Sequence, residues 1–427
     1  MKKNTQQYDL IVIGGGAAGM MMAGRAAECG AHVLLLEKNP ELGKKLSITG
    51  GGRCNITNAE FNVRTFLDNF PESKEFLFSP FSQFSAKDTL SFFEQKGLEL
   101  VVEARKRAFP KTQRAEDVTK TMVAYIKKHH VRVVTNACVT SIKQRAGDSY
   151  GVKTESGEEY VAPKIAIATG GRAAPETGST GDGFRFLKKL GHTIALPNPN
   201  IVPLKTDATW LHALSGLSLS FMRIRFMQDG KTKIKKLGKI LFTHFGISGP
   251  LVLNSSFEVG KLLTHGPVTA EIDLFPDSEE PDLDRKVLRL FEKNKNKMAK
   301  NVFPEFLPKG LGLAILELPD VALADKKVHS VTKEERQMLV KKMKRLTFGV
   351  TGTLGFDKAV IADGGVAPEE VDFKTMTSKL HLNIYLLGDV LNINRPSGGY
   401  SLQLAWTTGW VAGTHAAGAG VKSAKSA

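Results

Sequence analysis

Cysteine is scarce in this chain, and long apolar runs are missing from it. The three cysteines, Cys29, Cys54 and Cys138, lie far apart and form no C-x-x-C pair, so neither a metal site nor a redox-active disulfide is expected. No apolar run approaches the roughly 20 residues that a membrane-spanning helix needs. The amino-terminal stretch is a poor signal peptide, because its apolar part is interrupted by glycines. We therefore expect a cytoplasmic protein with no metal and no membrane association.

The rest of the composition is that of a globular protein with an ample core, at 42% hydrophobic and 24% charged residues. A length of 427 residues favours about two or three domains. The net charge of +16 is large for a metabolic enzyme. It favours a polyanionic partner or an anionic surface, although solubility alone is an alternative explanation.

An early stretch of the chain has the pattern of a dinucleotide-binding turn. A short apolar strand is expected at residues 10–13 and a helix rich in alanine and methionine at residues 17–29. Between them, Gly14, Gly16 and Gly19 form G-x-G-x-x-G. The first glycine permits a tight turn, the second lets the backbone reach a pyrophosphate, and the third lets the helix pack on the strand. The pattern predicts a phosphate-binding turn.

A second apolar strand, expected at residues 32–36, ends at Glu37. A carboxylate at this place can accept hydrogen bonds from ribose hydroxyls and would repel a 2′-phosphate, so the site suits FAD or NAD better than NADP. The helix amino terminus at Ala17 and Ala18 offers unpaired N–H groups to the phosphates. Lys38 is also included among the predicted cofactor contacts.

Two later strands favour FAD over NAD. One ends on Thr169, Gly170 and Gly171, and another, at residues 384–390, ends on a Gly-Asp pair that contains Asp389. In flavoproteins with two dinucleotide-binding domains, such an acid contacts the ribityl chain, and the helix after it directs its amino terminus at the flavin. Asp389 could equally be a turn cap. The contacts expected at that helix are Gly399, Tyr400, Ser401 and Leu402.

A run of three glycines occurs within residues 46–58, which read LSITGGGRCNITN. Glycines let backbone amides lie against a flavin without Cβ clashes, and consecutive N–H groups form a concavity that accepts anions. Arg53 is expected to address a phosphate or the substrate, and Asn55 a flavin carbonyl. Lys44 or Lys45 could reach the adenine ribose or pyrophosphate. The cofactor contacts predicted here and nearby are Lys44, Gly50, Gly51, Gly52, Arg53, Asn55 and Val139.

Together, the strings TGGGRCN, THFGISGP, TGTLGFDKAVIADGGV and GGYSLQLAWTTGWVAG resemble the HI0933-like flavoproteins, a bacterial family of NAD(P)/FAD-dependent oxidoreductases. The similarity extends from Tyr8 to about Gly413. It implies an α/β fold in which a Rossmann-like FAD-binding domain is interrupted by a long insertion. Members are described as reducing carbon–carbon double bonds. One branch resembles bile-acid-intermediate reductases, and another is associated with dihydrouridine in large-subunit ribosomal RNA.

The insertion differs in texture from the FAD-binding domain. Met222, Ile224 and Phe226 alternate with arginines, which is the period of a half-buried strand, and Asp229-Gly230 is a hairpin turn signal. Farther on, Thr332 and Glu335 form a capping box for a helix. We predict an FAD-binding domain at residues 1–195 and 348–427, a small antiparallel β-rich insert domain at 196–280 and a helical subdomain at 281–347.

Positive charge is concentrated in the insertion. Residues 205–345 contain 25 lysines and arginines and 17 acidic residues, for a net charge of +8, and the other 286 residues share the remaining +8. One predicted hairpin contains Lys231, Lys233, Lys235, Lys236 and Lys239. Such a cluster binds phosphates by releasing counterions, so ribosomal RNA or its precursor is the expected partner. The alternative is that these lysines are only solvated. No protein partner is predicted.

Reduction of an activated C=C bond needs a hydride for one carbon and a proton for its neighbour. Cys54, beside the glycine run, is a candidate proton donor or else a small buried hydrophobe. His244, which could instead order its own loop, and Tyr400 are the other candidates. A second G-x-G-x-x-G is absent, so NAD(P)H is expected to bind only transiently.

Three functions follow from these features. The first is an FAD-dependent, NAD(P)H-driven reductase that converts uridine to dihydrouridine in large-subunit ribosomal RNA. The second is a flavin reductase of small conjugated enones, such as steroid-like ketones. The third is an RNA- or ribosome-associated factor in which FAD is structural.

Overall fold

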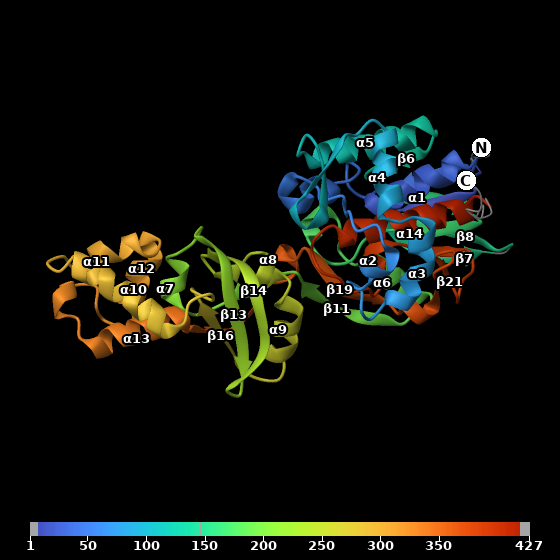
Figure 1. The fold of residues 1–427 in the computed structure, drawn as a ribbon. Coiled ribbons are helices and arrows are strands. Elements are labelled where there is room, and N and C mark those ends of the chain that lie inside the picture. Colours follow the sequence, from blue (N-terminus) through green and yellow to red (C-terminus); the bar gives the residue numbers. More distant parts are fainter. Residues whose placement is uncertain (1–6, 146, 419–427) are drawn as a thin grey trace. The chain divides into compact units, whose positions relative to one another are not determined.

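The computed structural model describes residues 7–145 and 147–418, which divide into two compact units (Figure 1). The first unit consists of residues up to Pro199 and from Ala359 onward, and the second of Asn200–Lys358. The predicted FAD-binding domain also includes residues 1–6 and 419–427, which lie outside the described residues. Each unit has its own apolar core.

A sheet of seven strands forms the centre of the first unit, in the order β20-β21-β22-β10-β1-β2-β6. The five strands from β22 to β6 are parallel, and β20 and β21 at the other end pair antiparallel. Strands β10, β1 and β2 are almost wholly buried, as their apolar sequences predict. The strands are β1 (Leu10–Ile13), β2 (Val33–Leu36), β6 (Arg132–Val134), β10 (Lys164–Ile167), β20 (Val371–Asp372), β21 (Thr377–Ser378) and β22 (Ile384–Leu386). The Rossmann-like α/β class is confirmed.

Helices α1 (Ala17–Glu28) and α14 (Tyr400–Ala416) pack closely against each other, although they come from opposite ends of the chain (Figure 1). Glycine allows this approach, because a Cβ on Gly409 would lie 2.5 Å from the backbone oxygen of Ala18. The other helices of this unit are α2 (Val63–Leu67), α3 (Lys74–Gln83), α4 (Ala86–Gln95), α5 (Ala115–Lys128) and α6 (Asp182–Lys189). The packing joins the two chain segments that the sequence assigns to the cofactor.

Three smaller sheets complete the first unit. They consist of β3 (Thr57–Asn58), β5 (Arg107–Pro110) and β4 (Leu100–Glu103); of β7 (Val139–Arg145), β8 (Ser149–Thr154) and β9 (Glu159–Ala162); and of β11 (Ile194–Asn200) with β19 (Ile361–Val366). Strands β11 and β19 flank the insertion in the sequence. The chain leaves the first unit at the end of β11 and re-enters it shortly before β19.

The second unit contains an antiparallel sheet in the order β17-β16-β13-β14-β15-β12-β18. Its strands are β12 (Leu204–Lys205), β13 (Ser218–Gln228), β14 (Lys231–Thr243), β15 (Gly246–Ser248), β16 (Val268–Asp273), β17 (Leu346–Val350) and β18 (Gly352–Thr353). Gln228 pairs with Lys231 across the turn at Asp229-Gly230, so the predicted hairpin is confirmed. In β13, Ile224 and Phe226 are buried, as their alternation predicts.

Helices make up the rest of the second unit. They are α7 (Thr209–His212), α8 (Pro250–Leu253), α9 (Ser256–Leu263), α10 (Glu280–Lys293), α11 (Ala299–Val302), α12 (Lys309–Leu316) and α13 (Lys333–Lys344). The predicted capping box is present, because the Thr332 side chain accepts a hydrogen bond from the backbone N–H of Glu335 and the Glu335 side chain accepts one from that of Thr332. Within the described residues, no helix is both long and apolar enough to cross a membrane.

The unit boundaries differ from those that the sequence suggests. The sequence returns the chain to the FAD-binding domain at Phe348, whereas the second unit extends to Lys358. The reason is strand pairing: β17 pairs with β16, and β18 pairs with β12, so both strands belong to the sheet of the insertion. At the other end, β11 keeps the chain in the first unit up to Pro199 instead of Ala195.

Candidate active site

The turn between β1 and α1 uses its glycines in two different ways. A Cβ on Gly14 (φ 105°) would lie 2.5 Å from the carbonyl oxygen of the residue that follows β10, and one on Gly19 would lie 1.9 Å from the oxygen of Gly14. Both positions are therefore closed by protein packing. At Gly16 a Cβ would meet no described atom within 4 Å. The open position precedes Ala17 and Ala18, the first residues of α1, whose N–H groups have no partner inside the helix.

Glu37 fastens this turn to the next loop. Its carboxylate is buried and accepts hydrogen bonds from the backbone N–H of Gly15, at 2.7 Å, and from the backbone and side-chain nitrogens of Asn39, at 2.8 and 2.7 Å. Lys38 extends in another direction, and its ammonium lies 2.9 Å from Asp182 at the start of α6. Glu37 is thus held beside the glycine turn, where a ribose contact is predicted.

The glycine run forms a loop of left-handed residues. Gly50, Gly51 and Gly52 have φ angles of 59°, 68° and 83°, a region that favours glycine. A Cβ on either of the last two would meet no described atom within 4 Å. The side-chain oxygen of Asn55 is buried and accepts no hydrogen bond from a described residue. Buried polar atoms normally have hydrogen-bond partners, so the open backbone and the Asn55 oxygen fit a surface that a cofactor such as FAD would cover.

Arg53, in contrast, has partners within the protein. Its Nε donates to Gln113 Oε1 at 2.6 Å, and its guanidinium pairs with Glu103 and lies 4.2 Å from the centre of the Phe109 ring. These partners hold the side chain against β4, β5 and the loop after β5. The predicted contact of Arg53 with a phosphate or substrate therefore competes with an ion pair that is already formed.

Asp389 lies at the centre of a cluster of charges after β22. It pairs with Arg395, whose side chain is only 1% exposed, and the Lys45 ammonium lies 3.6 Å away, too far for a hydrogen bond. Arg395 also donates to the backbone oxygen of Ile393, at 2.6 Å, and to Ser401 Oγ, at 3.1 Å. Burial alone would raise the pKa of Asp389, but the charges of Arg395 and Lys45 outweigh it and lower that pKa.

Sequence reasoning missed Arg395 and weighed Lys45 only as an alternative to Lys44. Lys44 is exposed, whereas the Lys45 ammonium is buried. A signal was available for Arg395, because a lone cation in a loop of small and polar residues, six positions after Asp389, lacks any nearby acid other than Asp389.

The other predicted contacts surround the same cluster. After β10, Gly171 approaches Asp389 so closely that a Cβ would lie 3.2 Å from its backbone oxygen. Thr169 and Gly170 precede it in that turn, and Gly170 has a left-handed φ of 72°. Val139 is buried at the start of β7. The turns after β10 and β22 therefore meet at the carboxyl edge of the parallel sheet, where doubly wound folds bind ligands.

The amino terminus of α14 packs against β3. A Cβ on Gly399 would lie 2.3 Å from the backbone of β3, so this position requires glycine. Tyr400 packs in an aromatic cluster with Phe66 and Phe70, at ring-centre distances of 5.0 and 6.0 Å, and burial raises its pKa. Leu402 packs against the main core. Tyr400 thus has a packing role whether or not it also donates a proton.

Cys54 is fully buried, and its backbone has a left-handed φ of 58°. Burial raises the pKa of its thiol to about 12, although a hydrogen bond with Thr49 opposes the shift. The group therefore stays a neutral thiol at neutral pH. His244 belongs to the second unit, in the turn between β14 and β15, where its ring centre lies 4.8 Å from that of Phe245.

We predict that iodoacetamide modifies Cys29 and Cys138, which are partly exposed, while Cys54 stays unmodified in the folded protein. The thiolate and not the thiol reacts with iodoacetamide. Raising the pH from 7 to about 9 should therefore not make Cys54 reactive, because the pKa of its thiol is about 12. Mass spectrometry of peptides from native and urea-unfolded protein measures this. Modification of native Cys54 as fast as Cys138 would contradict its burial.

A second group of residues, Ser378, His192 and Glu370, is hydrogen-bonded like the catalytic triad of a hydrolase, but it is closed to substrates. His192 Nδ1 lies 2.6 Å from Glu370 Oε2, and its Nε2 lies 2.9 Å from Ser378 Oγ. The hydroxyl is fully buried and accepts hydrogen bonds from the N–H groups of Leu380 and His381. Because no substrate can reach it, this chain of hydrogen bonds serves to hold β21 against the segment before β11.

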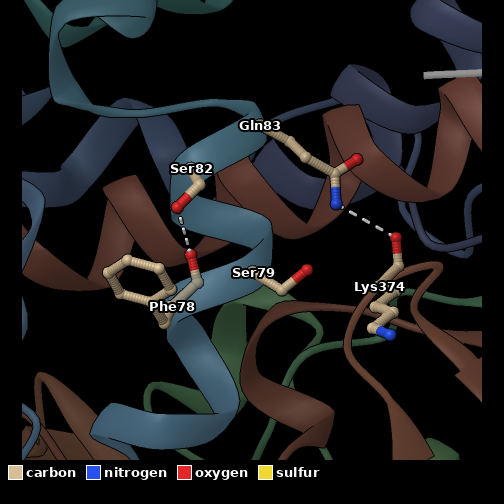
Figure 2. Close-up of a pocket in the computed structure, with 5 residues that line it drawn as sticks. All are labelled: Phe78, Ser79, Ser82, Gln83 and Lys374. Carbon is tan, nitrogen blue, oxygen red and sulfur yellow. Dashed lines mark hydrogen bonds between the residues drawn. The ribbon is translucent and has the colours of Figure 1, made fainter. Parts of the chain in front are cut away.

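A pocket on α3 is shown in Figure 2. Ser82 donates to the backbone oxygen of Phe78, and Gln83 donates to that of Lys374, at 2.8 and 3.1 Å. Ser79 completes the lining. None of these residues is a predicted FAD contact.

The fold and the site define an FAD-dependent oxidoreductase with a Rossmann-type domain. Within that class, the chain belongs to the HI0933-like protein Rossmann domain family, whose model matches residues 8–415. The resemblance found in the sequence strings is therefore confirmed.

Several curated relatives match nearly the whole chain. A 3-dehydro-bile acid delta(4,6)-reductase of Clostridium scindens is 29% identical over 413 residues, which are 95% of this chain and 98% of the relative. A ribosomal RNA dihydrouridine synthase of Haemophilus influenzae is 27% identical over 410 residues, with 95% and 98% covered. Among solved structures, the 3-ketosteroid-delta4-(5alpha)-dehydrogenase of Rhodococcus jostii shares the fold, with a TM-score of 0.54, 13% identity and 98% of each chain covered.

Proposed function

We propose that this protein reduces an activated carbon–carbon double bond with FAD and NAD(P)H, and that its substrate is uridine in large-subunit ribosomal RNA. The support for the reaction type comes from the two relatives, whose names both denote reduction of a double bond conjugated with a carbonyl group. One of these substrates is a small molecule and the other is RNA, so the relatives alone do not choose between them.

The observation that favours RNA is charge. The chain carries a net charge of +16, half of it in the insertion. This charge would favour binding of a polyanion, because each contact between a cationic side chain and a phosphate releases counterions. A small conjugated enone, the second candidate substrate, is not a polyanion and would gain nothing from the positive charge of the insertion. Charge supports this choice of substrate, and the reaction type rests on the family.

The net reaction is uridine + NAD(P)H + H⁺ → dihydrouridine + NAD(P)⁺. When bound, FAD supplies the hydride transfer between the two substrates. The open backbone at Gly16, Gly51 and Gly52 and the free oxygen of Asn55 would hold it. Asp389 would stand beside it, held by Arg395. Within the first unit the predicted proton donors are Cys54 and Tyr400, and Cys54 retains its proton at neutral pH.

The test uses purified, FAD-loaded protein without oxygen. We expect NADH or NADPH to bleach the flavin absorbance, and unmodified large-subunit RNA or its precursor to restore it. Nucleoside mass spectrometry should then find dihydrouridine in the RNA, and a strain that lacks the gene should lack this modification. Reoxidation by a conjugated enone but not by RNA would instead establish the small-molecule reductase. No bleaching by any reductant, together with salt-dependent RNA binding, would leave FAD a structural role.

A further inference from the structure

The hairpin of β13 and β14 (Figure 1) carries several exposed lysines. Alternate residues of a strand point to opposite sides. In β14, Ile234, Ile240 and Phe242 are buried, whereas Lys235, Leu237 and Lys239 between them are exposed. A register shift at Lys233 places Lys231 opposite Gln228 at the turn. Four lysines of β14 are exposed: Lys231, Lys233, Lys235 and Lys239. We call these four residues the lysine row.

The lysine row is not neutralised by its neighbours. On β13, Arg223 lies 3.2 Å from Asp273, and Arg225 pairs with Glu271, so both arginines are balanced by acids of β16. On β14, Lys236 pairs with Glu258. Within the described part of the chain, no acidic group forms an ion pair with the lysine row. Its positive charge is therefore available to an anion from outside.

Two apolar side chains are exposed beside these lysines. Phe221 is 71% exposed and has a left-handed φ of 59°, which is rare for an aromatic residue. It lies in a bulge of β13, between Leu219 and Met222, and Lys239 is the residue of β14 opposite that bulge. Leu237, 58% exposed, is in the middle of the same face. The bulge thus presents a ring to solvent at one end of the lysine row.

We propose that the lysine row and Phe221 form a docking surface for single-stranded RNA. This inference rests on the proposed function, because it supplies the surface that would hold the substrate. Proteins that bind single strands combine cations along the backbone with aromatic rings on which bases stack. The row spans about 27 Å along one strand, which suits a linear chain of phosphates. An anionic membrane would favour a broader apolar surface than one ring and one leucine.

The experiment measures binding of a fluorescent 20-nucleotide uridine-rich RNA to the oxidised, FAD-loaded protein from 50 to 300 mM salt. Replacing all four residues of the lysine row by glutamine should reduce the steepness of the log–log salt dependence by about 3. Phe221→Ala should weaken binding roughly ten-fold and leave the salt dependence unchanged. A matched control replaces four exposed lysines of the helical region by glutamine, and it should bind nearly as the original: Lys293, Lys295, Lys297 and Lys333.

Equal losses in the lysine-row and control variants would overturn the proposal, because they would show that only net charge matters. Binding to phosphatidylserine vesicles in place of RNA would also overturn it. Thermal melting and FAD content establish that each variant is folded. Binding is measured without turnover, so the two proposals can fail separately. RNA binding as expected without dihydrouridine formation would leave the docking surface standing, and dihydrouridine formation unaffected by the variants would leave only the reductase.

Discussion

Gly16→Ala is expected to weaken FAD binding by about 10- to 100-fold, which corresponds to about 1.4–2.8 kcal/mol, and to leave the stability of the apoprotein unchanged. A Cβ at this position would meet no described protein atom within 4 Å, and its φ of −79° suits any residue. The added methyl group would therefore clash only with a cofactor phosphate. Fluorescence titration of the apoprotein with FAD and urea unfolding without FAD measure the two effects.

Gly19→Ala is the matched control, since it adds the same methyl group three residues later. Here a Cβ would lie 1.9 Å from the backbone oxygen of Gly14, so α1 would have to move away from β1. Overpacking of this kind costs roughly 1–3 kcal/mol of unfolding free energy, with or without FAD. Normal FAD binding by Gly16→Ala would contradict the assignment of this turn to the pyrophosphate. An apoprotein as stable as the original in Gly19→Ala would contradict the packing role.

Local patterns explain which parts of the fold the sequence could predict. The spacing of Gly14, Gly16 and Gly19 predicts the turn. Glycine is required at these positions by close backbone contacts or by the space that the cofactor would occupy. The alternation around Ile224 and Phe226 likewise depends only on the side that each residue faces. Such patterns depend little on the rest of the chain, so they can be recognised in the sequence alone.

Partners from distant segments explain what could not be predicted. Arg53 pairs with Glu103 and Gln113, which are 50 and 60 residues away, and nothing near Arg53 indicates that its charge is already balanced. Lys45 and Arg395 meet at Asp389 only because β2 and β22 belong to one sheet. The predicted end of the insertion differs from the observed one for the same reason. Only the pairing with β16 shows that β17 belongs to the sheet of the insertion.

Asp389→Asn is expected to lower the free energy of unfolding by about 3–5 kcal/mol at pH 7, because it leaves the buried Arg395 guanidinium without its counter-charge. The double variant Asp389→Asn/Arg395→Met removes both charges of the pair and should recover the part of the loss that Arg395 causes, while the buried Lys45 ammonium still lacks its acid. Urea unfolding of the apoproteins measures the effect without any contribution from FAD. As a control, Asp325→Asn breaks the exposed pair with Lys300 and should leave the free energy of unfolding nearly unchanged.

The pH dependence of this loss identifies the ion pair as its cause. The folded pKa of Asp389 is lowered, so the pair's contribution is fully present above the unfolded value of about 3.9 and is lost as the pH falls through the folded value. The stability gap between the original protein and Asp389→Asn should therefore close in acid. A gap that stays constant down to pH 2 would mean that Asp389 acts through packing. A double variant no more stable than Asp389→Asn would mean that the cost does not come from the unpaired Arg395 guanidinium.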